Sequence, residues 1–250
     1  MKTLILYSIV FLSFSFMADN FKSQQLKISR VKAAYTEKEK LVKEWFSSKG
    51  VALSSSVIFI RVFKKDAELE IWAKNLKDEK FQLIKTYAVC ASSGELGPKR
   101  KQGDLQVPEG FYAIDRFFPL SNYHLGLGVS YPNASDKILG GKGDLGGDIL
   151  IHGNCVTIGC IPLTDDKIKE VYLMAVEAKS DLPAGQNIPV HIFPFRMNGE
   201  NMKTYEEKYK DNTKLIAFWK NIQKGYDSFE HTHKLRSVKV NSSGEYSFID

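Results

Sequence analysis

The sequence predicts a mainly-β fold with flanking helices, and two patterns together with the composition lead to this prediction. Short segments rich in Val, Ile, Phe and Tyr, with apolar and polar residues in alternation, begin near residue 57 and recur to residue 196. Segments before, between and after them carry apolar residues at helical spacing. The 250 residues are 43% hydrophobic and 26% charged, which is typical of a folded globular protein.

Residues 1–22 are expected to be a signal peptide or a signal anchor. Lys2 precedes an uncharged run, Thr3–Met17, which has the length of a signal-peptide core and is short for a membrane span. The cleavage pattern is poor, so cleavage and anchoring both stay open. No second apolar run reaches spanning length. We therefore expect export to the periplasm or cell envelope, with membrane contact only through this segment if it is not cleaved.

Residues 23–54 are expected to form an N-terminal helix laid against the body. Its apolar residues recur at helical spacing, and Gly50 is a natural stop. These residues are Val31, Ala34, Tyr35, Val42, Trp45 and Phe46.

Residues 55–196 are expected to form the main domain. Its strands are predicted in the segments "SVIFIRVFKK", "ELEIWAKNL", "FQLIKTYAVCA", "VPEGFYAIDRF", "YHLGLGVSYP", "DILIH" and "IPVHIFPFR". A helix is predicted in "TDDKIKEVYLMAVEAK", with Thr164 as its N-cap. Residues 197–250 are expected to be an extension, a helix capped by Asn212 followed by a terminal hairpin.

The strand "YHLGLGVSYP" predicts the floor of a binding cleft. Its leucines share one face, whereas His124, Ser130 and two glycines share the other. We expect His124, Ser130, Tyr131 and Asn133 to contact the substrate.

The net charge of +6 and the pI near 9.0 suit a partner rich in carboxylates or phosphates. No zinc-finger spacing or nucleic-acid recognition pattern is present in the sequence, so nucleic acid is not expected as a partner. No metal or organic cofactor is expected.

The segment "IHGNCVTIGC" has the composition of a cysteine-nucleophile site. His152 ends a predicted strand, and Cys160 comes just before the predicted helix, whose dipole is expected to favour a thiolate. Gly159 allows a tight turn in which consecutive N–H groups can hold an oxyanion. Cys155 lies within the loop and lacks these features, so Cys160 is the expected nucleophile and His152 its base.

Two structural alternatives compete with this prediction. His152, Cys155 and Cys160 could bind zinc, although structural zinc sites usually take four ligands. A disulfide between Cys155 and Cys160, or from either of them to Cys90, is more plausible in an exported protein. By default, Cys90 is expected to be a small buried hydrophobic residue.

Several motifs resemble the YkuD-type L,D-transpeptidase family. "DILIHGNCVTIGC" is similar to the family's catalytic motif, and "GPKRKQGDLQVPEGFY" and "LGLGVSYPNASD" resemble its YafK-like branch more narrowly. The similarity extends from about Ser29 to the C-terminus. It implies a β-sandwich-like catalytic domain, with Cys160 as nucleophile, His152 as base and the Gly153 carbonyl orienting the imidazole.

The sequence also departs from the family pattern in the residues just before Cys160 and just after it. Thr157 stands where the family has serine, Gly159 precedes the nucleophile as expected, and Ile158 replaces a second histidine that would help to hold the oxyanion. The family's arginine shortly after the nucleophile is replaced by "IPL". We expect the turn of Thr157, Ile158 and Gly159 to supply backbone N–H groups.

The resemblance implies a cysteine enzyme that acts on peptidoglycan stem peptides through a thioester. Hydrolysis as an L,D-carboxypeptidase, or cleavage of a link between the cell wall and a protein, would use the same residues. A non-catalytic wall-binding module is the alternative outside the enzymes.

Overall fold

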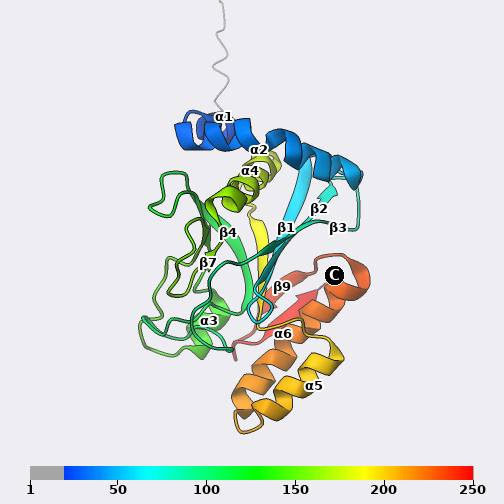
Figure 1. Cartoon of the computed structure of the whole chain (residues 1–250). Coiled ribbons are helices and arrows are strands. Elements are labelled where there is room, and N and C mark those ends of the chain that lie inside the picture. Colours follow the sequence, from blue (N-terminus) through cyan, green and yellow to red (C-terminus); the bar gives the residue numbers. More distant parts are fainter. Residues whose placement is uncertain (1–19, 250) are drawn as a thin grey trace, which may run out of the picture.

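The computed structural model describes residues 20–249, and its centre is one curled, mixed sheet of eight strands (Figure 1). The spatial order of the strands is β3-β2-β1-β8-β4-β5-β6-β7. The bounds are β1 (Ser56–Phe63), β2 (Glu68–Asn75), β3 (Gln82–Ala88), β4 (Gly110–Phe118), β5 (Gly126–Val129), β6 (Leu150–His152), β7 (Ile161–Pro162) and β8 (Ile188–Phe193). The predicted mainly-β body with flanking helices is confirmed.

Two pairs of neighbouring strands are parallel. β1 pairs with β8 and β6 pairs with β7 in this way, whereas the other neighbours in the sheet are antiparallel. The β6–β7 pair lies at one edge of the sheet and carries the "IHGNCVTIGC" segment. The fold therefore places this segment at an edge, where loops can reach it.

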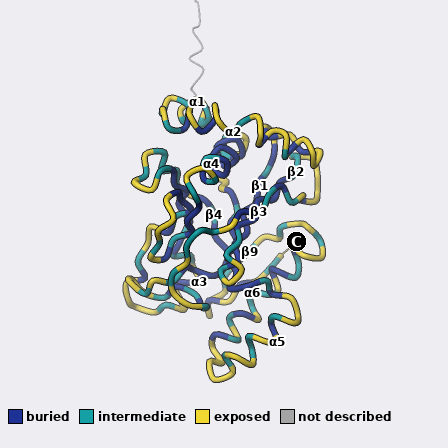
Figure 2. The backbone as a smooth tube through the Cα atoms, in the orientation of Figure 1, coloured by how far each residue is buried: buried dark blue, intermediate teal, exposed yellow. Residues whose placement is uncertain are grey.

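Three helices pack together at one end of the sheet: α1 (Phe21–Leu26), α2 (Ser29–Ser48) and α4 (Asp165–Asp181) (Figure 1). Their inward faces join the main hydrophobic core, while their outward faces are exposed (Figure 2). Lys38 on α2 forms an ion pair with Asp166 on α4, with 2.5 Å between Nζ and Oδ1. Thr164 caps α4 as predicted, since its side chain accepts a hydrogen bond from the Lys167 N–H.

The predicted single helix over residues 23–54 is two helices, with a break at Lys27 and Ile28. The first of them begins at Phe21, whose ring packs edge-on against Phe117 with 4.8 Å between centroids. Residues 20–22, the last part of the predicted leader, are thus part of the described fold. The rest of that leader, residues 1–19, lies outside the described residues.

The C-terminal extension contains α5 (Gly199–Lys208), α6 (Thr213–Thr232) and a hairpin of β9 (Ser237–Val240) and β10 (Tyr246–Ile249). Asn212 caps α6 and the hairpin forms, as predicted. The sequence analysis did not anticipate α5. The extension packs on the sheet through a second apolar cluster that includes Phe63, Phe193 and the fully buried Trp219.

Two short elements and one turn also differ from the prediction. α3 (Ala134–Leu139) and β7 were not predicted, because elements this short show no clear periodicity. His124 precedes β5 in a turn with φ of +69°, rather than lying on a strand. Within residues 20–249, no helix combines the length and apolar character that a membrane span requires.

Candidate active site

The parallel pairing of β6 and β7 brings His152 and Cys160 to the same sheet edge. Ile151 is paired with Ile161 and His152 with Pro162, so Cys160 stands one residue before β7. His152 ends β6, and both isoleucines are buried in the core. The sequence prediction that His152 ends a strand is confirmed.

Cys160 carries the free thiol of this protein, since the other two cysteines form a disulfide. Its Sγ accepts a hydrogen bond from the Leu150 N–H at 3.4 Å and donates to the Asp148 carbonyl at 3.6 Å. Burial raises the pKa of the Cys160 thiol, and the hydrogen bond from Leu150 offsets this only in part. At neutral pH the residue is therefore a thiol rather than a preformed thiolate.

The thiol lies against a cavity of about 280 Å³. One wall is the end of β1 and the residues after it, including Lys64, and the other is the loop after β3, including Ser92 and Ser93. Lys64 itself is not free to bind a ligand, because its Nζ donates to the carbonyls of Glu95, Gly97 and Val107 and to the Glu109 carboxylate. The sequence analysis missed this cavity, since its walls come from segments far apart in the chain.

His152 is buried, and its surroundings fix both its tautomer and its charge. The Nδ1–H donates to the Gly153 carbonyl, so the lone pair is on Nε2. The Tyr123 ring covers the imidazole, with 4.6 Å between centroids and an interplanar angle of 31°. Burial lowers the pKa of His152, and the Gly153 carbonyl opposes that shift only in part. The imidazole is therefore neutral at pH 7 and can accept a proton.

The structure does not join the two side chains by a hydrogen bond. Within the described residues, the Cys160 sulfur bonds to backbone groups of Asp148 and Leu150, and His152 does not line the thiol's cavity. A neutral thiol and a neutral imidazole therefore lie at one sheet edge without forming an ion pair.

The turn before Cys160 is built around the Thr157 hydroxyl. It donates to the Cys160 carbonyl at 2.8 Å and accepts from the Gly159 N–H at 3.1 Å. Gly159 has φ of +136°, and a Cβ there would lie 3.0 Å from the Gln106 carbonyl oxygen, so this position requires glycine. Ile158 is 78% exposed at the tip of the turn.

These contacts correct two expectations about the turn. The Gly159 N–H is already bonded to Thr157, so it is not free for an oxyanion, whereas the Cys160 N–H has no hydrogen-bond partner among residues 20–249. Cys160 also does not stand at a helix N-terminus, because β7 intervenes and α4 begins at Asp165. The helix dipole decays within one turn and therefore does not act on the thiol.

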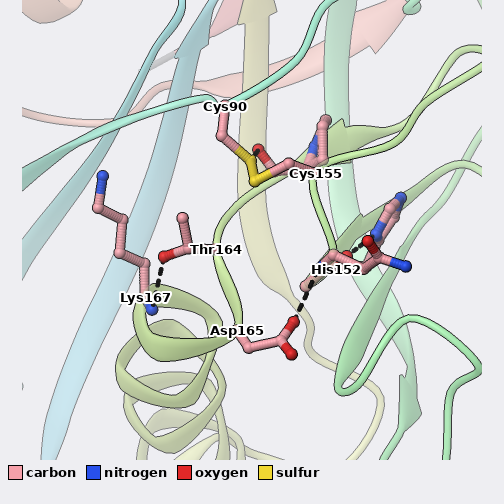
Figure 3. Close-up of a disulfide and its surroundings, with 9 residues drawn as sticks. Cys90, His152, Cys155, Thr164, Asp165 and Lys167 are labelled. Carbon is pink, nitrogen blue, oxygen red and sulfur yellow. Dashed lines mark hydrogen bonds between the residues drawn. A yellow bond between two sulfur atoms is a disulfide. The ribbon is translucent and has the colours of Figure 1, made fainter.

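A disulfide between Cys90 and Cys155 ties the loop after β3 to the loop after β6 (Figure 3). Cys90 is thus a cross-link rather than a buried hydrophobic residue, and its N–H also donates to the Pro162 carbonyl at 3.1 Å. Among the pairings that the sequence left open, this one leaves Cys160 free. It also removes the zinc alternative, because a disulfide sulfur is not the thiolate that zinc binds.

Asp165 holds the other half of this loop to helix α4 (Figure 3). Its Oδ1 accepts from the Asn154 N–H at 2.8 Å, which supports the left-handed φ of +59° at Asn154. A Cβ on Gly153 would lie 2.6 Å from the same oxygen, so glycine is needed here as well. The sequence placed Asp165 only in the first turn of the helix; its contact with the loop needed the tertiary structure.

The four residues expected to contact substrate are part of the framework. Ser130 Oγ accepts from the Ala113 N–H, and the Tyr131 hydroxyl donates to the Leu145 carbonyl. Asn133 caps α3 and donates to the Phe111 carbonyl and the Tyr246 hydroxyl. None of these residues, nor His124, lines the cavity at Cys160. The structure holds no substrate, so their expected contacts with it stay a prediction. His124 Nε2 is buried without a partner among the described residues.

Comparison with known proteins agrees with this geometry. Residues 59–192 match the model of the YkuD L,D-transpeptidase catalytic domain. YafK of Escherichia coli (strain K12) is 38% identical over 192 residues, which cover 75% of this chain and 72% of that protein. The chain belongs to the YkuD L,D-transpeptidase catalytic domain family. The YafK protein of Escherichia coli O157:H7 matches with the same identity and coverage, and the resemblance to YafK is confirmed.

Two solved structures also align with this chain. The helical cell shape determining protein Pgp2 of Campylobacter jejuni aligns with a TM-score of 0.44 and 19% identity, covering 80% of each chain. Bd1075 of Bdellovibrio bacteriovorus aligns with a TM-score of 0.38 and 23% identity, covering 70% of this chain and 60% of that one.

The raised pKa of Cys160 predicts how the thiol reacts with iodoacetamide. Only the thiolate is alkylated, so the rate should rise with pH through a midpoint above 9.0, the ordinary value for a cysteine here. Mass spectrometry of the labelled protein follows one free thiol without interference. A midpoint well below 9.0 would show that Cys160 forms a thiolate–imidazolium pair, and our description of the site would be wrong.

The disulfide is predicted to stabilise the fold by closing a long loop. Its cysteines are 65 residues apart, and chain entropy for such a loop corresponds to about 4 kcal/mol. We expect the double variant Cys90→Ala/Cys155→Ala to unfold at a clearly lower urea concentration in circular dichroism. Wild-type protein under reducing conditions should shift in the same direction. Equal midpoints in all three samples would contradict a closed disulfide.

Proposed function

We propose that this protein is an exported peptidoglycan enzyme that acts on stem peptides through a Cys160 thioester. One observation carries the proposal: the family's nucleophile position holds the free thiol, at a cavity, at the same sheet edge as a neutral buried histidine. The disulfide supports an oxidising compartment outside the cytosol. The basic net charge of +6 suits the carboxylates of stem peptides.

The first step is proton transfer from the Cys160 thiol to His152 Nε2 as the sulfur attacks the substrate carbonyl carbon. This requires the thiol to leave the Asp148 carbonyl, to which it donates in the resting structure. The Gly153 carbonyl holds the Nδ1–H and so stabilises the imidazolium that forms. The unpartnered Cys160 N–H is the backbone donor for the oxyanion.

Collapse of the tetrahedral intermediate expels the leaving amine, which takes the proton from the imidazolium. The product is a thioester on Cys160. An acceptor amine or water then attacks that thioester, with His152 taking its proton, and the thiol is restored. Transfer and hydrolysis differ only in this second nucleophile.

Hydrolysis is the second candidate outcome, and the exposure of Ile158 favours it. With 78% of its surface exposed, Ile158 neither donates to an oxyanion nor covers the sulfur from water. An L,D-carboxypeptidase, or an enzyme that cleaves a link between peptidoglycan and a protein, would use the same site.

The Cys160 thioester is tested with a tetrapeptide-stem muropeptide. Cys160→Ala should form no acyl-enzyme in intact-protein mass spectrometry, because a methyl group cannot bond to the acyl carbon. His152→Ala should acylate roughly 10²–10⁴-fold more slowly, the usual effect of losing a positioned base. His231→Ala, a substitution of an exposed histidine on α6, is the control and should behave as wild type. Normal acylation of Cys160→Ala, or of His152→Ala at neutral pH, would refute the assignment.

The partition between transfer and hydrolysis is tested by adding a D-amino acid acceptor. We expect hydrolysed tripeptide to be a substantial product beside the exchanged tetrapeptide, since water reaches the thioester past Ile158. Ile158→His should shift the product ratio or the rate, because an imidazole there can donate to the oxyanion; one lost donor costs roughly 3 kcal/mol. Val156→His, which changes another exposed residue of the same loop, is the matched control. Exchange product in large excess for the wild type would show that the protein is a transpeptidase with little hydrolysis.

A further inference from the structure

A second cavity is formed between the C-terminal extension and the loop of residues 96–106. Its volume is about 550 Å³, compared with about 280 Å³ at the thiol. Its lining includes Leu96, Arg100, Gln106, Lys214, Leu215 and Phe218. The catalytic residues are not part of this lining, so the mechanism above does not use the cavity.

We propose that this cavity binds the carboxylate-bearing part of a stem peptide that lies away from the scissile bond. The choice of a stem peptide as the ligand rests on the proposed function. The preference for a carboxylate rests on the residues that line the cavity. The extension would thus supply a second substrate-binding site to the catalytic domain.

The charges of the lining favour an anion. Arg100 is fixed by Asp136 at 2.7 Å and by the Phe218 ring at 5.2 Å, and its Nε and Nη2 form no hydrogen bond within residues 20–249. Lys214 is exposed and has no ion pair among the same residues. The one acidic residue of the lining, Glu245, already accepts hydrogen bonds from Asn241 and Ser243. Two cations with unused N–H groups therefore face the cavity, and guanidinium groups pair well with carboxylates.

The remaining lining is apolar and suits the stem of a peptide. Leu215 and Phe218 lie on one side of α6, opposite Leu96 and Pro98 of the loop. Such a mixture, apolar walls with a few polar groups that fix orientation, is typical of ligand sites. α6 also begins beside the cavity with no acidic residue in its first turn, so its dipole adds to the preference for an anion.

The cavity is separate from the one at the thiol, but both lie against the same loop. Leu96 lines both cavities, and the Gln106 carbonyl lies against Gly159, next to the nucleophile. The extension holds this loop in place, because Trp219 Nε1 on α6 donates to Glu109 at 2.9 Å and the same carboxylate accepts from the Gly97 N–H at 2.7 Å. A peptide held at Cys160 can therefore extend past Leu96 into the second cavity.

The test measures binding and turnover separately with two variants of the cavity. Lys214→Gln removes one cation, and Ala217→Trp fills the cavity from an exposed position on α6. Lys224→Gln and Lys224→Trp, at an exposed position of α6 outside the lining, are the matched controls. Circular dichroism melts verify that each variant is folded.

Binding is measured by calorimetry in the Cys160→Ala background with a muramyl tetrapeptide and with the same peptide amidated at its carboxylates. We expect Lys214→Gln to weaken binding of the free acid roughly 1.5-fold to fivefold, as for one exposed charge pair, and Ala217→Trp to weaken it more. The amidated peptide should bind wild type and Lys214→Gln equally. In the active protein, KM should rise while kcat changes little.

Equal affinity of the cavity variants and the controls for the free acid would overturn the proposal. Equal loss with the amidated peptide would show that Lys214 does not recognise a carboxylate and would also overturn it. Failure of the proposed function would be seen differently, as wild-type protein that forms no acyl-enzyme although the peptide binds.

Discussion

The parallel pairing of β6 and β7 at the sheet edge is the constraint on which the site depends. Parallel neighbours usually need a crossover of about a dozen residues or more, often containing a helix. Here residues 153–160 make the connection, so the loop must be held in a strained, compact path. Asn154 and Gly159 adopt positive φ, and Asp165, Thr157 and the disulfide to Cys90 each fix one part of the path. His152 and Cys160, the proposed base and nucleophile, stand at the two ends of this connection.

Burial then sets the chemistry of those two residues. It raises the pKa of Cys160 and lowers the pKa of His152, so both shifts favour the neutral forms. The resting site therefore holds a neutral thiol and a neutral imidazole rather than an ion pair, and in the proposed mechanism the proton moves during attack. The Asp148 carbonyl holds the thiol in this resting state, and the Gly153 carbonyl holds the imidazole in the tautomer that can accept a proton.

The C-terminal extension contributes to the site through the loop of residues 96–106. Glu109 is fully buried and joins Trp219 of α6, the Gly97 N–H and Lys64. A buried charge pair of this kind adds little net stability but penalises any arrangement that leaves one member unpaired. The loop that separates the two cavities is thus tied to both the sheet and the extension.

The sequence by itself determined every strand of the main sheet except β7, the helix caps at Thr164 and Asn212, the terminal hairpin and the position of His152 at a strand end. These features depend on local periodicity and on side chains that bond to nearby backbone, so a short window of sequence contains their cause. It also contained the motifs that identify the family. Only the tertiary structure decided that Cys155 pairs with Cys90, that the Gly159 N–H is taken by Thr157, and that Ser130, Tyr131 and Asn133 support the framework. It alone also revealed the two cavities and the role of Asp165. Each of these features depends on contacts between segments that the sheet order brings together, or on hydrogen bonds that form only in the folded chain. A short stretch of sequence does not show which distant segments will meet.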